Sequence, residues 1–118
     1  MRLFYKIASL SLLFGIIHSV LTPVFYKEMN LDWFWFFATG FTLVFSGFMN
    51  LFAIYGNRKW MYSICIISNL IMLIWIVALS VIMKGEINAL VVVFMYLGVT
   101  IGSVYFRFYL NSPELLEK

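Results

Sequence analysis

Charged residues are scarce in this chain of 118 residues. Eight Lys and Arg and five Asp and Glu amount to 11% of the sequence, whereas 64% of it is hydrophobic. Soluble domains carry roughly 25% charged residues, because a small domain has to cover a large surface with polar groups. The composition therefore excludes a soluble globular domain of this length.

Charge is absent altogether from four long stretches. Residues 7–26, 33–57, 60–83 and 87–106 contain no Asp, Glu, Lys or Arg and are 20, 25, 24 and 20 residues long. An α-helix needs about 20 apolar residues to cross the hydrocarbon core of a bilayer. The sequence therefore predicts an all-α membrane protein with four transmembrane helices, at about residues 4–25, 33–56, 60–83 and 87–109.

The chain lacks the residues that several kinds of membrane chemistry need. Proton-coupled cation export uses a carboxylate within the membrane, and none of the four stretches contains one. Thiol–quinone exchange needs paired cysteines, and a haem held by two histidines needs two, but Cys65 and His18 are the single cysteine and histidine. Glu-x-x-His motifs for a di-metal site are also missing. We expect no catalytic residue, no metal site and no cofactor.

The basic residues are distributed unevenly over the connections. With the N-terminus inside, the outer connections carry Lys27 and Lys84. The inner side then carries six basic residues, namely Arg2, Lys6, Arg58, Lys59, Arg107 and Lys118. Because basic residues favour the cytoplasmic side, the sequence predicts a multi-pass protein of the bacterial cytoplasmic (inner) membrane with both termini in the cytoplasm. The basic surplus is thus a topology signal, and we expect the lipid bilayer, and no nucleic acid, as a partner.

The connections between the predicted helices are short. They comprise about six residues at Lys27–Asp32 and about three each at Asn57–Lys59 and Lys84–Glu86, so consecutive helices must lie side by side and antiparallel. The sequence therefore predicts a single domain over residues 1–118, an up-down-up-down bundle of four transmembrane helices. Pro23 predicts that the first helix ends or kinks close to it.

Each predicted helix has one face of small or polar residues, which membrane helices use for close contact and hydrogen bonding. Gly98 and Gly102 form a GxxxG pair that permits close backbone approach. The residues that we expect at helix contacts are Gly15, Gly40, Gly47, Asn50, Asn69, Gly98 and Gly102. Any membrane bundle needs such faces, so they support the fold without identifying a function.

His18 is the only ionisable side chain that we place within the hydrocarbon core. An ionisable residue at that depth is a candidate functional site. Thr22, Thr39 and Ser80 fall in the same outer half of the predicted bundle, which predicts a polar, outward-facing ligand pocket around His18. The alternative is a purely structural, neutral imidazole that bonds a hydroxyl or carbonyl of another helix.

Several short motifs carry a resemblance to a known group. They are Gly15–His18 followed by Pro23, Ala38–Gly40, Ser46–Leu51 and the basic turn Arg58–Lys59. In these the chain resembles the small bacterial four-helix DoxX-like and related membrane proteins. The resemblance implies the four-helix fold. Some of that group are linked to quinone or respiratory redox systems, and most have no assigned activity.

Three functions stay open from the sequence. The first is a non-enzymatic binding or accessory component with the pocket around His18, acting alone or with a larger membrane protein partner. The second is a membrane redox subunit that uses His18 near a quinone. The third is a small transporter or channel that acts as a homodimer.

Overall fold

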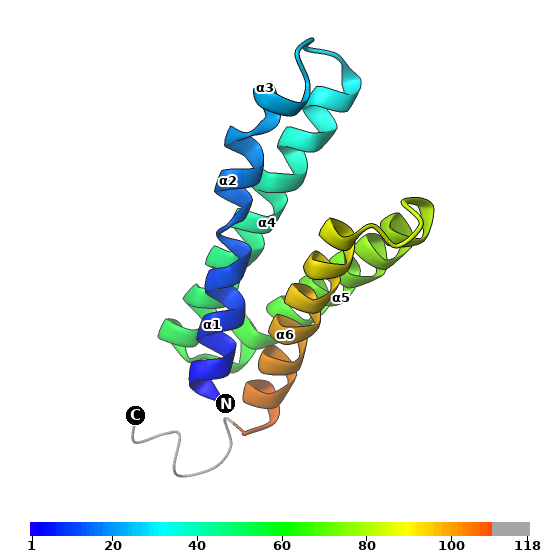
Figure 1. Ribbon diagram of the computed structural model, residues 1–118. Coiled ribbons are helices and arrows are strands. Elements are labelled where there is room, and N and C mark those ends of the chain that lie inside the picture. The colour runs from blue at the N-terminus through cyan, green and yellow to red at the C-terminus, as the bar shows by residue number, and fades with distance from the viewer. Residues whose placement is uncertain (110–118) are drawn as a thin grey trace.

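The computed structural model describes residues 1–109, so Lys118 of the orientation count lies outside it. Over the described residues the chain is all-helical and contains no strand. The elements, drawn in Figure 1, are α1 (Arg2–Leu12), α2 (Gly15–Val20), α3 (Thr22–Phe25), α4 (Leu31–Gly56), α5 (Lys59–Ile82) and α6 (Ile87–Tyr109). Four helical stretches are long and apolar enough to cross a membrane, namely Arg2–Val20, Leu31–Gly56, Lys59–Ile82 and Ile87–Tyr109.

The first of these stretches is interrupted between α1 and α2. The backbone N–H of Leu13 donates to the carbonyl of Leu10, and that of Phe14 to Ser11, at 3.0 and 3.1 Å. These bonds span three residues rather than four, which tightens the turn locally. A second break at Leu21 precedes Pro23, which lies in the first turn of α3, where its missing N–H costs nothing.

Local residue chemistry explains the ends of the longer helices. The side chain of Asn30 caps α4 by accepting the N–H of Trp33 at 3.0 Å, which satisfies one of the free donors of the first turn. Asn57, with φ of 48°, ends α4 in the left-handed region, which Asn tolerates better than most residues. After α5, Lys84 and Gly85 both have positive φ, and Gly85 N–H bonds the carbonyl of Ser80 at 2.8 Å.

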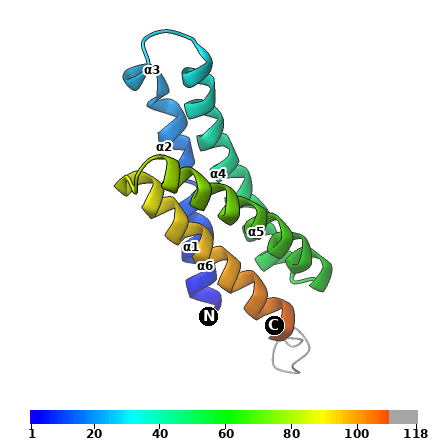
Figure 2. The same cartoon turned by 90° about the vertical axis from the view of Figure 1, so that its right-hand side faces the viewer.

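The helices divide the molecule into two halves. We call residues 1–12, 46–69 and 96–109 the closed half; there α1 packs against both α4 and α6, and α5 packs against α6 and α4. We call residues 15–43 and 71–95 the open half. In it, α2 and α3 pack along α4 and form one arm with it, while α5 and α6 form the other arm. The two arms splay apart (Figure 1). Figures 1 and 2 both show α5 and α6 side by side.

Candidate functional site: a groove between two helical arms

A buried polar network crosses the closed half. Asn50 and Asn69 form a reciprocal amide pair, with each Nδ2 donating to the other's Oδ1 at 3.0 and 2.9 Å. The hydroxyl of Tyr5 donates to Asn50 Oδ1 at 2.6 Å. All three side chains are buried, with 0% exposure. The pair and the tyrosine thereby connect α1, α4 and α5 through groups that have no access to solvent.

The network reaches α6 at two points. Asn69 Nδ2 lies 3.4 Å from Ser103 Oγ, and the hydroxyls of Ser46 and Tyr96 lie 2.9 Å apart. Asn50 Nδ2 also donates to the carbonyl of Ser46 at 2.7 Å. Because a broken bond would leave a buried polar group unpaired, the network holds the four long helical stretches together in this half.

Glycines allow the backbones to approach one another closely. Gly102 lies against the ring of Tyr5, and Gly98 lies opposite Ala8, so the GxxxG face of α6 contacts α1. Gly15 and Gly40 face each other between α2 and α4, where a side chain on either would meet the backbone oxygen of the other. Gly47 packs against α1. All of these contacts lie within the α1–α6 or α1/α2–α4 pairs, and none joins the two arms.

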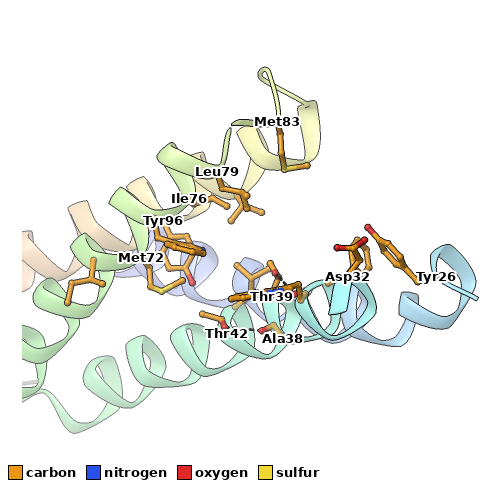
Figure 3. A pocket seen from close by; sticks show the side chains of 16 residues that line it. Tyr26, Asp32, Ala38, Thr39, Thr42, Met72, Ile76, Leu79, Met83 and Tyr96 are labelled. Atoms are coloured by element: carbon orange, nitrogen blue, oxygen red, sulfur yellow. Dashed lines mark hydrogen bonds between the residues drawn. The ribbon is translucent and has the colours of Figure 1, made fainter. Parts of the chain in front are cut away.

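A groove of about 610 Å³ opens between the two arms. We call it the interarm groove; its walls come from α4 between Asp32 and Leu43 and from α5 and its end between Ile71 and Met83. Tyr26, Val92 and Tyr96 complete the lining. In Figure 3 Tyr96 lies at the inner end, and Asp32 and Tyr26 lie at the opposite end.

Both threonine hydroxyls in the walls are already bonded within their own helix. Thr39 Oγ1 donates to the carbonyl of Trp35, and Thr42 Oγ1 to that of Ala38, both at 2.9 Å. Tyr96 shares its hydroxyl with Ser46 in the buried network. The walls therefore offer mainly apolar and aromatic contact, which is typical of small-molecule sites.

His18 lies behind one wall of the groove. Its imidazole stacks on the ring of Phe36, with centroids 3.9 Å apart and an interplanar angle of 20°, and Phe36 itself lines the groove. The imidazole also lies close to the Phe36 backbone. Within the described residues Nε2 is buried without a hydrogen-bond partner. The imidazole of His18 thus interacts with its neighbours mainly through aromatic stacking.

The other sequence candidates occupy separate places. Thr39 lines the interarm groove, whereas His18, Thr22 and Ser80 do not. Thr22 is fully buried, and its hydroxyl lies 3.5 Å from the carbonyl of His18. Ser80 is buried on α5. The structure therefore brings His18 and Thr22 together, and Thr39 lines the groove together with Phe36, on which His18 stacks.

Three residues of the groove and network did not stand out in the sequence. Tyr5 lies beside Lys6 at the charged edge of the first stretch, which obscured its role. Tyr96 lies in the middle of a span, where a hydroxyl needs a partner, and that position was the available signal. Asp32 lies at the boundary of the second stretch, and a carboxylate at that position is typical of a solvated connection between helices.

A smaller, apolar groove of about 360 Å³ lies between α4 and α5 in the closed half and is lined by Phe48, Trp60 and Cys65 among others. Cys65 is a buried free thiol whose Sγ lies 3.6 Å from the carbonyl of Met49. In the part of the chain that the structure describes, no cluster of three or more His, Cys, Asp or Glu residues could hold a metal ion.

A comparison of the chain with protein-family models, curated proteins and solved structures gives no match. Any function therefore has to be inferred from the residues and their geometry.

Proposed function

We propose that this chain is a multi-pass protein of the bacterial cytoplasmic membrane that binds a lipophilic molecule in the interarm groove without transforming it. The groove carries the proposal: it has a volume of about 610 Å³, which lies in the range of small-molecule sites. It also has aromatic and aliphatic walls and one polar end (Figure 3). A molecule dissolved in the bilayer has direct lateral access to a groove that opens between helices.

The outer surface of the helices supports membrane insertion. Large apolar side chains point outward from all four long stretches, for example Leu3, Phe45, Ile74 and Phe94, which are 69–71% exposed. Water would make so much exposed apolar surface unfavourable, whereas lipid favours it, provided that the backbone is satisfied within helices. The described residues meet that condition, since helices account for nearly all of them.

The distribution of basic residues supports an orientation with both termini in the cytoplasm. The closed half then faces the cytoplasm and the polar end of the groove faces outward. In an up-down-up-down arrangement of this kind, cysteines placed at Met29 and Glu86, which are exposed, are expected to react with an impermeant maleimide from outside. A cysteine at Arg58 is expected to react only after the membrane is opened. The reverse labelling pattern would contradict the orientation.

Filling the groove tests the binding function directly. Ala38 lines the groove and is exposed to it, so Ala38→Trp is expected to weaken retention of a lipophilic ligand at least ~10-fold. Val81→Trp, at a position 72% exposed and outside the lining, is the matched control and should retain the ligand. Mass spectrometry of molecules held after gentle extraction provides the measurement. Equal retention by both variants would overturn the proposal.

A membrane redox role with a quinone is the second candidate function. Trp35, Phe36 and Trp75 line the groove, and their rings offer flat faces for a quinone ring. Recovery of a quinone in the same mass-spectrometry experiment would favour this candidate over a simple binding protein. The resemblance to DoxX-like proteins, some of which are linked to quinone systems, stays a prediction from the sequence.

A further inference from the structure

We propose that the ligand of the interarm groove is a single-chain amphiphile with a positively charged ammonium headgroup, which is held at the outer end by Asp32. This inference rests on the proposed function, because it names the class of molecule that the groove binds. The chain of the amphiphile would lie between the arms, and its headgroup would lie at the end where Figure 3 shows Asp32 and Tyr26.

Among residues 1–109, Asp32 is the only charged side chain in the lining of the groove. Lys27 and Lys84 belong to the two turns at the same end of the molecule, but neither lines the groove. Asp32 is exposed at the mouth of the apolar cavity, and its carboxylate gives that end of the groove a negative potential. The charge of the groove therefore complements a cation.

The carboxylate of Asp32 is not engaged by the protein. Within residues 1–109 it makes no ion pair or hydrogen bond. A purely structural role for Asp32 would be to stabilise the N-terminus of α4 through the helix dipole. That terminus, however, already has a side-chain cap, since Asn30 accepts the N–H of Trp33 at 3.0 Å. Both carboxylate oxygens of Asp32 thus stay available to a ligand.

Aromatic rings lie next to this carboxylate in the groove. Trp35 and Phe36 follow Asp32 by three and four residues on α4, which places them on the same side of the helix. Trp75 from α5 and Tyr26 also line the groove. Aromatic faces attract ammonium groups, and together with a carboxylate they favour a cation over a neutral headgroup of the same size.

The inner part of the groove fits an alkyl chain. Leu43, Met72 and Ile76 line it, and the hydroxyl of Tyr96 at its end is already bonded to Ser46. No unpaired charge lies among these inner residues to hold a second headgroup. An anionic or zwitterionic lipid would bring a negative charge toward Asp32, so a net positive amphiphile is the better match.

Fluorescence quenching tests this inference. In a variant with Trp33 and Trp60 replaced by Phe, the remaining Trp35 and Trp75 both line the groove. The protein is placed in nanodiscs of uncharged lipid and titrated with brominated dodecyl chains that carry a trimethylammonium, a hydroxyl, a phosphocholine or a sulfate headgroup. At equal concentration in the membrane, the trimethylammonium probe is expected to bind about tenfold more tightly than the hydroxyl probe.

The variants assign the preference to one residue. Asp32→Asn is expected to reduce the preference for the cation to about twofold or less while leaving binding of the hydroxyl probe unchanged. Asp32→Glu should keep the preference, and so should Glu86→Gln, which removes a carboxylate at the same end but outside the groove. Added salt should weaken the preference in the native protein.

The outcomes separate this inference from the proposed function. Equal saturable binding of the ammonium and hydroxyl probes would overturn the cationic ligand and leave the binding groove standing. Tighter binding of the phosphocholine or sulfate probe would do the same. A preference that survives Asp32→Asn would overturn the role of Asp32, and failure of every probe to saturate would overturn the proposed function itself.

Discussion

The closed and open halves are built from the same four helical stretches and differ in what lies between them. In the closed half, buried amides and hydroxyls connect all four stretches, with Asn50 and Asn69 at the centre. In the open half, polar groups bond within one arm, as Thr42 does with its own helix, and the space between the arms is the groove. The polar bonds connect all four stretches in the closed half, and in the open half none of the bonds described joins the two arms.

Removing an amide from the closed half is expected to have the largest effect on stability. Asn50→Leu would break the reciprocal pair and leave Asn69 and the Tyr5 hydroxyl without their partner. The expected cost is about 2–3 kcal/mol in the free energy of unfolding. Titration with a denaturing detergent, monitored by circular dichroism, measures the free energy of unfolding.

The open half supplies the matched control for that experiment. Thr42→Val removes a hydroxyl that bonds the backbone of its own helix, and it is expected to change the free energy of unfolding by less than about 0.5 kcal/mol. If both variants lost the same stability, the contrast between the halves would not originate in the polar network.

A smaller loss is expected from filling the contact between α1 and α6. A Cβ on Gly102 would lie 2.5 Å from Tyr5 Cγ and 2.9 Å from Tyr5 Cβ, so Gly102→Ala should cost about 1–3 kcal/mol through overpacking. On Gly98 the nearest atom would be Ala8 Cβ at 3.1 Å, and Gly98→Ala should cost less than about 1 kcal/mol. Thermal unfolding in detergent ranks the two, and a milder effect at Gly102 would contradict the packing described.

Only a small loss of stability is expected from replacing His18, in the arm of the open half, by Phe. His18→Phe keeps the stack on Phe36 and removes the unpaired Nε2, so the free energy of unfolding should change by less than about 1 kcal/mol. His18→Ala, which loses the stack, is the control and should be less stable than His18→Phe. A greater loss for His18→Phe than for His18→Ala would show that the imidazole makes a polar bond that stability depends on.

Particular residues show how far the sequence predicts the structure. The charge-free stretches predict four helices of membrane length, because length and hydropathy are properties of consecutive residues, and the structure contains four such helices. Pro23 predicts a break near the end of the first stretch, and α2 ends at Val20. The additional break at Leu13 and Phe14 has no proline to signal it.

The partners of individual side chains were beyond prediction. Tyr5 bonds Asn50 across 45 residues of sequence, and helical periodicity gives only the face of a helix that a residue occupies. The sequence predicts a pocket that contains both His18 and Thr39, but in the structure Thr39 lines the groove and His18 instead stacks on Phe36 of the groove wall. Depth in a helix is readable from the sequence, whereas the rotation of one helix against another is not.

The sequence by itself determined that the chain forms four apolar helices with short connections, because the hydrophobic length and the turn residues are local. Only the tertiary structure decided that the helices meet in one half and separate in the other. That choice depends on which faces contact each other: Asn50 and Asn69 bond between helices in the closed half, whereas Gly15 and Gly40 join α2 to α4 within one arm. The groove and the free carboxylate of Asp32 at its mouth are consequences of that arrangement.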